Sequence, residues 1–412
     1  MTDEKTKKVG IGITAAVLSV FFVGQAAFII NPAIASIAAM YPDIPLSTIT
    51  YVSTIVSVCC IPFSLLAGSI AGTKIKYKTL ALIAIGLITI GGVAGYFTTN
   101  FFALLGTRLV LGAGLGMSTP IGNAVIMKIY DGKRRATMQG LGLAVQNISG
   151  IILVFLSGVL VVVDISYVWL LHLVMIIPLI IVLIFFKEPV KDSTIDTNDA
   201  SNTTTGKTSA KSKMPIAVLL YCIGYGIIFM CYYPILLNMS SIVTTEGIGT
   251  AALAGTIGSM YSIGGMLGGL AFAPVFKVLG RKFSIPVSLV LTTVCVAMAA
   301  VSSNAIVIMV AVAFSGFALF IIWPASIMEF GEICPSDRMA FASGLFFAFL
   351  NVGGFLASPY MGIIAAASNN PSPRLPLVVS AVIIAIVTVL WSILILGHKK
   401  GQTHMADSKP VE

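Results

Sequence analysis

The chain repeats itself at an offset of 204 residues, and this internal repeat limits its fold more than any other feature. A matching spacing over two apolar segments and the loop between them is difficult to obtain by chance. Repeats of this length predict a fold built from two related halves. The matched pairs are Gly112 and Gly316, Leu115 and Leu319, Pro120 and Pro324, Arg134 and Arg338, Ala136 and Ala340, Gly140 and Gly344, Leu141 and Leu345, Ala144 and Ala348, Asn147 and Asn351, Gly150 and Gly354, and Gly158 and Gly362.

Long apolar segments indicate that both halves cross a membrane. Hydrophobic residues make up 58% of the chain and charged residues 9%, whereas about a quarter of a soluble domain is charged. Runs of this length can cross about 30 Å of hydrocarbon as helices. We therefore expect an all-α membrane protein with twelve transmembrane helices in two pseudo-symmetric six-helix bundles. The expected spans are 11–38, 48–72, 79–98, 102–127, 136–162, 167–186, 216–238, 250–276, 283–302, 305–330, 339–364 and 375–397.

The basic residues predict how this bundle is oriented. If the N-terminus is cytoplasmic, only Arg374 among the 24 Lys and Arg residues falls in an outer loop, and Arg108 lies inside a span. The positive-inside rule requires such an asymmetry. We expect a multi-pass protein of the cell membrane with both termini in the cytoplasm. The net charge of +9 then reflects orientation and needs no nucleic-acid partner.

A polar segment separates the two sets of six spans. Residues 187–215 are rich in Ser, Thr, Asp and Lys and lack apolar periodicity, which predicts a disordered cytoplasmic linker. Because an even number of spans precedes the second half, both halves have the same orientation, and a substrate path should lie between them. The expected domains are an N-terminal tail 1–10, a first bundle 11–186, the linker 187–215, a second bundle 216–397 and a C-terminal tail 398–412.

Three short motifs accompany this arrangement. They are Arg108-Leu-Val-Leu-Gly112-Ala-Gly114 in the fourth span, Gly280-Arg281-Lys282 after the eighth, and Glu332-Ile-Cys-Pro335-Ser-Asp-Arg338 after the tenth. With its six plus six spans and long middle loop, the chain resembles the major facilitator superfamily over nearly its whole length. The resemblance implies a transporter whose two bundles rock around a central site. Arg281, Glu332 and Arg338 are then expected gating residues.

The chain departs from that family's pattern after the second span. Gly72 and Thr73 stand where the family usually has Asp and Arg, so the acid–base latch of the first half is not expected. In the second half, Glu332 and Arg281 can still form one. The family's antiporter signature, which ends in Gly-Pro on the fifth span, is missing as well.

Arg108 is the one charged residue that falls firmly within a span, and a charge there is costly and usually functional. Two interpretations stay open. Arg108 either faces the cavity and attracts an anionic substrate, or clamps helices by bonding backbone carbonyls of the first span. Its matched position is Val312, so this charge belongs to one half only.

Amide side chains are the next candidates for the cavity. Asn147 and Asn351 are matched across the repeat near mid-membrane, where an unpaired amide is costly. We expect both to contact substrate or to form interhelical hydrogen bonds. Gln25 and Asn31 lie six residues apart in the first span, which on an α-helix places them on roughly opposite faces. Gln25 is then the expected cavity residue, and Asn31 with Pro32 marks a kink.

Aromatic residues also lie inside the spans. Tyr221, Tyr225 and Tyr232 follow one face of the seventh span, and Trp323 lies deep in the tenth, away from the interface where Trp usually anchors. For each of these four residues two interpretations have equal weight: the side chain lines the cavity, or it packs against neighbouring helices.

Glycines recur at matched positions and are expected to let helices approach closely and slide. They are Gly140, Gly150, Gly344 and Gly354, together with Gly112 in the fourth span. No metal-ligand spacing, nucleotide-binding loop or nucleophile–base pair occurs in the sequence. We therefore expect no metal, no cofactor and no enzymatic activity.

The sequence favours a secondary active or facilitative transporter that moves a small polar or anionic organic solute across the cytoplasmic membrane by alternating access. We expect a monomer in membrane lipid, with or without a co-transported ion. A proton-coupled multidrug or metabolite efflux pump stays open, because Glu329 near the inner end of the tenth span can titrate. A transporter-like membrane receptor is the alternative of another class, although the linker and tail show no folded output domain.

Overall fold

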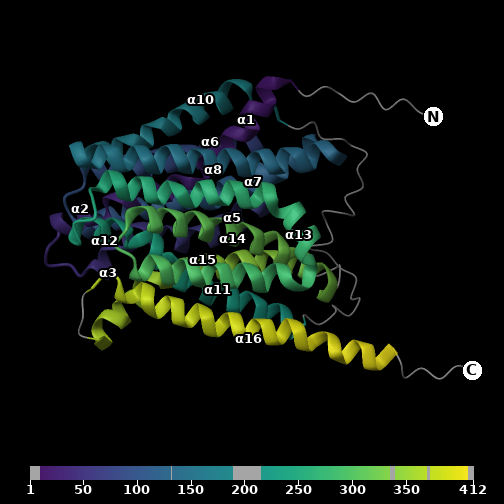
Figure 1. Ribbon diagram of the computed structural model, residues 1–412. Coiled ribbons are helices and arrows are strands. Elements are labelled where there is room, and N and C mark those ends of the chain that lie inside the picture. Colours follow the sequence, from purple (N-terminus) through teal and green to yellow (C-terminus); the bar gives the residue numbers. More distant parts are fainter. Residues whose placement is uncertain (1–9, 131, 189–214, 335–338, 369–371, 407–412) are drawn as a thin grey trace, which may run out of the picture.

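The structure is a bundle of long helices (Figure 1). The computed structural model describes residues 10–130, 132–188, 215–334, 339–368 and 372–406. Within these residues, twelve helices are long and apolar enough to cross a membrane, and their bounds are close to those expected. The all-α membrane fold with twelve spans is confirmed.

Each half contributes six spans, several of them divided into shorter helices. The first half contains α1 Ile11–Phe22, η1 Val23–Ala33, α2 Ile34–Met40, α3 Leu46–Ile49, α4 Tyr51–Thr54, α5 Val56–Ile70, α6 Tyr77–Val93, η2 Ala94–Phe97, α7 Phe101–Ile129, α8 Gly132–Val163, α9 Ser166–Leu170, η3 Leu171–Met175 and α10 Ile176–Phe185. The second half contains α11 Ile216–Leu237, α12 Met239–Thr245, α13 Ala251–Val301, α14 Ala305–Ile333, α15 Met339–Ser368 and α16 Leu375–Ala406.

The bundle has two ends that differ in the connections they carry. The tether end, on the right in Figure 1, is where α1 begins, α10 ends and α11 begins. The far end carries the connections that follow α2, η2, α8 and α12. Both halves therefore start and finish at the tether end, as the parallel repeat predicts.

The repeat is visible in the capping of α7 and α14. Both helices have 29 residues, and both begin after an asparagine whose side chain accepts hydrogen bonds from the first turn. Asn100 Oδ1 accepts from the backbone N–H of Phe102 at 2.8 Å, and Asn304 Oδ1 accepts from that of Ile306 at 2.9 Å. Asparagine is a preferred N-cap because it satisfies donors that the helix leaves unpaired. The matched halves thus begin these spans by the same local mechanism.

Spans eight and nine are joined by a single residue within α13. Gly280 has φ 67° and ψ 172°, and this left-handed conformation redirects the chain between two helical segments. Glycine adopts it at little cost because it has no Cβ. The connection is shorter than the expected gap between residues 276 and 283.

Charged side chains secure the ends of two other spans. At the tether end, Glu188 Oε1 accepts a 2.6 Å hydrogen bond from the N–H of Tyr77, which begins α6. A carboxylate there also complements the helix dipole. At the far end, Arg374 forms a two-pronged ion pair with Glu246 and donates to the carbonyl of Ala300 at 2.8 Å. Arg374, the basic residue expected in an outer loop, therefore has a structural role.

Each half has an apolar core of its own, and the two cores meet toward the far end. The core of the first half takes in Tyr233, Leu237 and Ala357 from the second half. All three lie in the stretches of α11 and α15 nearest the far end. The halves are therefore packed together at that end.

Hydroxyl groups join the halves in the same region. Ser358 Oγ lies 2.8 Å from Thr50 Oγ1 and 2.7 Å from Thr54 Oγ1. Between α12 and η1, Ser240 Oγ donates to the backbone carbonyl of Pro32. We call these contacts of Thr50, Thr54, Ser358, Ser240 and Pro32 the far gate.

Candidate functional site

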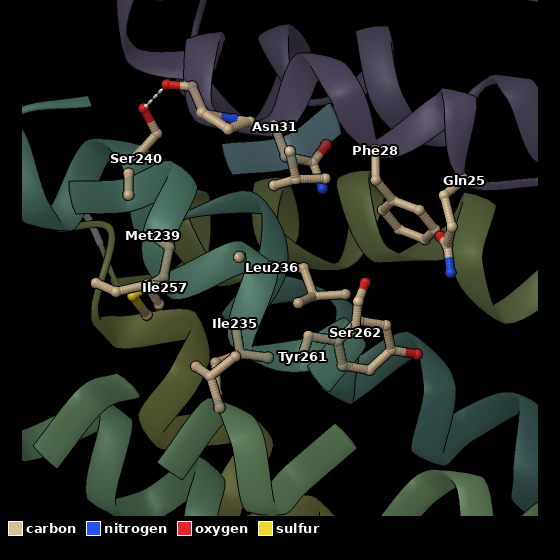
Figure 2. Close-up of a pocket in the computed structure, with 15 residues that line it drawn as sticks. Gln25, Phe28, Asn31, Ile235, Leu236, Met239, Ser240, Ile257, Tyr261 and Ser262 are labelled. Atoms are coloured by element: carbon tan, nitrogen blue, oxygen red, sulfur yellow. Dashed lines mark hydrogen bonds between the residues drawn. The ribbon is translucent and has the colours of Figure 1, made fainter. Parts of the chain in front are cut away.

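A narrow cavity lies between the two halves, next to the far gate. Its free volume for a water-sized sphere is about 20 Å³, which is room for about one water molecule. Its walls come from η1 and α8 of the first half and from α11, α12, α13 and α14 of the second. The polar or aromatic residues of the lining are Gln25, Phe28, Asn31, Ser240, Tyr261 and Ser262 (Figure 2).

The winding of η1 brings Gln25 and Asn31 to the same wall. Val23–Ala33 is a 3₁₀ helix, in which about three residues complete a turn. Residues six apart are then one above the other, and Figure 2 shows Gln25, Phe28 and Asn31 projecting from one side of the helix. The expectation that Gln25 and Asn31 lie on opposite faces was wrong, because it assumed α-helical winding.

The polar groups of the cavity are uncharged. Asn31 Oδ1 accepts a 2.8 Å hydrogen bond from Ser53, and both residues are buried. Gly150 makes room for the side chains of Gln25 and Ser262, since a Cβ there would lie 3.1 Å from Gln25 Cγ and would collide with Ser262 Oγ. None of the fifteen residues that line the cavity is Asp, Glu, Lys, Arg or His. The site can form neutral hydrogen bonds but offers no counter-ion.

Aromatic rings form the other part of the wall. The ring of Phe28 lies 6.5 Å from that of Tyr261 and 6.1 Å from that of Tyr233, measured between centroids. Tyr261 in turn lies 5.8 Å from Tyr232. Tilted rings at these separations attract one another beyond simple burial. The cavity therefore combines an aromatic surface with amide and hydroxyl groups.

Arg108 is buried away from this cavity, inside the first half. Its Nη2 donates to the carbonyls of Gly91 and Gly92 at 2.7 and 3.0 Å. The guanidinium also lies 5.0 Å from the ring centroid of Trp169. Arg108 thus clamps α7 to the third span, and not to the first span as expected. Direct contact between Arg108 and a substrate stays a prediction.

The matched asparagines both bond back to their own helix. Asn147 Nδ2 donates to the carbonyl of Leu143 at 3.0 Å, and Asn351 Nδ2 donates to that of Phe347 at 2.9 Å. The buried Oδ1 of Asn147 has no hydrogen-bond partner, and it lies 3.0 Å from where a Cβ of Gly265 would be. Asn147 therefore directs a free acceptor toward the other half, beside the cavity.

The aromatic candidates pack within the second half. Tyr221 makes edge contacts with Phe330 and Trp391, and Tyr225 lies against Phe346. Tyr232 is fully buried and its hydroxyl lies 2.9 Å from Ser315 Oγ. Trp323 meets Phe347 with ring centroids 4.7 Å apart. The structure does not bring these four residues into the cavity, and substrate contact by them stays a prediction.

The expected glycines differ in what they contact. Gly112 packs against the backbone of Val56, and Gly354 faces Ser57 of the other half with 3.3 Å between the position of a Cβ and Oγ. At Gly140 and Gly344, no atom lies within 4 Å of where a Cβ would be. Both lie in the part of their helix nearest the tether end. Gly354 and its matched Gly150 thus approach the other half at mid-helix, whereas the expectation of close helix approach at Gly140 and Gly344 was wrong.

Among the remaining gating candidates, the structure describes the side chain of Glu329. Glu329 is half-buried near the end of α14. The side chains of Arg281 and Glu332 and all of Arg338 lie outside the described residues, so the proposed latch of the second half stays a prediction. Among the residues that the structure describes, no group of three His, Cys, Asp or Glu side chains could hold a metal ion.

Several cavity residues were not found from the sequence. Phe28 and Tyr261 have no signal of their own, because aromatic residues are common in membrane helices. Ser240 and Ser262 are small hydroxyl residues whose neighbours become known only when the halves are placed together. The signal that could have indicated Phe28 is its spacing of three residues from Gln25, which places the two side chains near one face in either kind of helix.

Comparisons with known proteins agree with this architecture. The family model described as Major Facilitator Superfamily matches residues 16–249 and 221–410. No curated protein sequence matches the chain. The solved structure of the nucleoside transporter NupG is similar with a TM-score of 0.73 at 13% identity, covering 94% of this chain and 99% of that one.

Two further solved structures are similar over a comparable length. A bacterial homolog of the human lysosomal transporter Spinster, in an inward-facing and unoccupied conformation, has a TM-score of 0.70 at 12% identity, covering 93% of this chain and 96% of that one. A D-xylose–proton symporter has a TM-score of 0.69 at 13% identity, covering 92% and 96%. At these identities the likeness is one of fold.

Proposed function

The chain belongs to the major facilitator superfamily, and on this premise we propose that it carries a small, uncharged, polar organic solute across its membrane by alternating access. It is a multi-pass membrane protein and a solute transporter, not an enzyme. The uncharged character of the solute is the part we infer from the cavity.

The observation that carries this proposal is the uncharged lining of the cavity. A charged solute that enters a low-dielectric site without a counter-ion loses its hydration at a cost of several kcal/mol. The cavity offers amides from Gln25 and Asn31 and hydroxyls from Tyr261 and Ser262. Arg108, the residue that would favour an anion, is bonded to carbonyls elsewhere. A neutral solute is therefore favoured over an anionic one.

The contacts between the halves support a solute path from the tether end. The far gate closes one side of the cavity, while the matched Gly140 and Gly344 near the tether end are exposed, with no atom within 4 Å of where a Cβ would be. If Lys and Arg mark the cytoplasmic side, the tether end is cytoplasmic and this conformation is open to the inside. Rocking of the halves would then break the far gate and bring the tether end together.

The experiment is transport by purified protein in liposomes. We would measure uptake of radiolabelled uridine, D-xylose, L-lactate and choline. The proposal expects one or both neutral solutes to be transported, with L-lactate and choline neither transported nor competing. Gln25→Ala should reduce the flux, and Ser326→Ala should not, since the Ser326 hydroxyl bonds the Ile322 carbonyl of its own helix. Transport of a charged solute alone would overturn the proposal.

The two alternatives make different predictions in the same assay. A proton-coupled efflux pump would move protons with its solute, and Glu329→Gln would abolish that proton flux. A receptor would bind a solute without moving it. Neither has an observation in its favour that the transporter lacks.

A further inference from the structure

A second hollow lies on the outside of the first half, between α1, α8 and the sixth span. It leaves about 220 Å³ free to a water-sized sphere, compared with about 20 Å³ in the cavity between the halves. An apolar space of about 150 Å³ is enough to take up benzene. Eight of its nine lining residues are apolar, and the hydroxyl of the ninth, Ser19, bonds the Ala15 carbonyl of its own helix. We call this hollow the lateral groove.

The groove arises because α1 lies between two helices that diverge. At the tether end α1 packs against α10, since a Cβ at Gly12 would lie 2.7 Å from Phe185 Cδ1. Further along, α1 packs against α8, where a Cβ at Gly142 would lie 3.0 Å from Phe21 Cδ1. In Figure 1, α10 diverges from α8 toward the tether end, with α1 between them. Residues 15–22 of α1 therefore form the floor, and the fifth and sixth spans form the walls.

The lining residues form apolar stripes that no other helix covers. In α1 they follow the helical spacing i, i+3, i+4 and i+7, at Ala15, Leu18, Ser19 and Phe22. The four lining residues of the sixth span, from Val174 to Ile181, repeat this spacing. One of them, Ile177, is 60% exposed. The groove thus opens to the surroundings of the bundle, which within a membrane span are lipid tails.

The groove lies in the leaflet at the tether end. Ala15 is four residues from the start of the first span at Ile11, and Val145 is eight residues from the start of the fifth at Thr137. At about 1.5 Å per residue these depths are about 6 and 12 Å, within the half of a hydrocarbon core that is about 30 Å thick. A lipid whose tail occupies the groove therefore has its headgroup at the tether end.

Basic residues lie at that level on both walls. Arg134 of α8 is eleven residues nearer the tether end than Val145. Eleven residues of α-helix rise about 16 Å and end only about 20° from a whole number of turns, so Arg134 lies on the face of α8 that lines the groove. The sixth span ends at Phe185, and Lys187 follows it. Arg134 and Lys187 are both exposed and lie just outside the apolar segments.

The charge at the mouth of the groove is positive. Among the residues that the structure describes, neither Arg134 nor Lys187 forms an ion pair, and the neighbouring Glu188 accepts hydrogen bonds from the N–H groups of Tyr77 and Lys78. Basic residues between membrane helices at the level of the headgroups attract anionic lipids. An apolar groove below two such charges matches a lipid with one long tail in the groove and a negative headgroup.

We propose that the lateral groove binds one acyl chain of an anionic phospholipid and that Arg134 and Lys187 hold its phosphate. The groove binds the chain by burying methylene groups, and the two basic residues select an anionic headgroup over a zwitterionic one. The site shares no lining residue with the cavity between the halves, so it is independent of the solute that is carried.

The test is native mass spectrometry of the purified full chain in a neutral detergent. Dioleoyl phosphatidylglycerol and dioleoyl phosphatidylcholine have the same chains and differ in net charge. We expect one phosphatidylglycerol per protein to be retained at a concentration about thirtyfold lower than phosphatidylcholine requires, the ratio expected for two basic residues. Equal retention of the two lipids would show non-selective lipid contact only and would overturn the proposal.

Charge removal tests the headgroup contact. Arg134→Gln should weaken the binding of phosphatidylglycerol about fivefold and leave that of phosphatidylcholine unchanged. Lys277→Gln is the matched control, because it removes the same charge from an exposed position at the tether end of the second half. It should leave the binding of both lipids unchanged. An equal loss in the two variants would trace the selectivity to net charge and overturn the role of Arg134.

Filling the groove tests the chain contact. Ala15→Trp should abolish retention of both lipids in protein that stays monodisperse, whereas Ile363→Trp, at an exposed position on α15, should retain them. A competitor tests the same point without a substitution. Dihexanoyl phosphatidylglycerol has the same headgroup on short chains and should not displace the dioleoyl lipid at equal concentration. Displacement by it, or full retention by Ala15→Trp, would show that the groove holds no chain and overturn the proposal.

Discussion

The first and seventh spans occupy matched positions in the two halves and line the same cavity by different means. The first span contributes Gln25, Phe28 and Asn31 at intervals of three. The seventh contributes the apolar residues Ile235 and Met239 at the α-helical interval of four. The first span thus supplies two amides, whereas the seventh supplies mainly apolar surface together with the Ser240 hydroxyl. Two halves with the same fold have diverged in winding as well as in side chains.

The fourth and tenth spans differ in a similar way. Arg108 in α7 is buried against carbonyls of the third span, whereas Val312, its matched residue in α14, lines the cavity. The repeat preserves the helices and their caps, while the residues inside the bundle have separate roles. The comparison teaches that the charge in one half bonds backbone carbonyls as a clamp, whereas the matched residue in the other half lines the cavity.

Among the substitutions that test this comparison, removal of Arg108 should lower the stability of the protein most. Arg108→Met leaves two buried carbonyls without their charged donor, and bonds of that kind contribute about 1.5–3 kcal/mol each. We expect a clearly lower apparent Tm in detergent, with Val312→Met affecting transport more than Tm. An unchanged Tm together with lost transport would show instead that Arg108 acts on the substrate.

Removal of the Gln25 amide should affect transport and leave stability nearly unchanged. One net hydrogen bond of about 1.4 kcal/mol corresponds to a tenfold change, so Gln25→Ala should raise the KM for a neutral solute about tenfold. The control is Ile235→Val on the seventh span, which keeps the apolar wall and should leave KM nearly unchanged. Equal changes of KM in the two variants would contradict the view that the first span bonds the solute and the seventh mainly forms an apolar wall.

Loss of the Ser240 hydroxyl should weaken the far gate. The Ser240 hydrogen bond contributes about 1 kcal/mol net, so its loss should increase roughly fivefold the population of molecules whose two halves are apart at the far end. Spin labels at Val163 and Thr245 would report that population by pulsed electron resonance. The matched residue in the first half provides the control, since Ser36→Ala should produce a smaller shift. An unaltered distance distribution in Ser240→Ala would exclude this hydroxyl from the gate.

The ion pair between Glu246 and Arg374 should have the smallest effect. Partly exposed pairs contribute about 0–1 kcal/mol, so Glu246→Gln should lower Tm only slightly. The difference from the unmodified protein should shrink in 1 M salt, which screens exposed charges. A large loss of transport would contradict a purely structural role.

The sequence allowed the membrane fold to be predicted because apolar length and the 204-residue repeat are direct physical constraints. Gln25 was predicted as a cavity residue from its depth in the first span. Asn31 was placed on the wrong face, because periodicity arguments assume α-helical winding and nothing in Val23–Ala33 announces a 3₁₀ stretch. The partner of Arg108 was also misjudged, since carbonyls carry no sequence signal. Tyr261 and Ser262 become visible only when the two halves are packed together.

A structure with solute bound would test the central claim most directly. The protein would be prepared with whichever neutral solute the liposome assay shows to be transported. We expect density between η1 and α13, within hydrogen-bonding distance of the Gln25 and Asn31 amides. Density beside Arg108, between α7 and the third span, with the cavity between the halves empty, would contradict it.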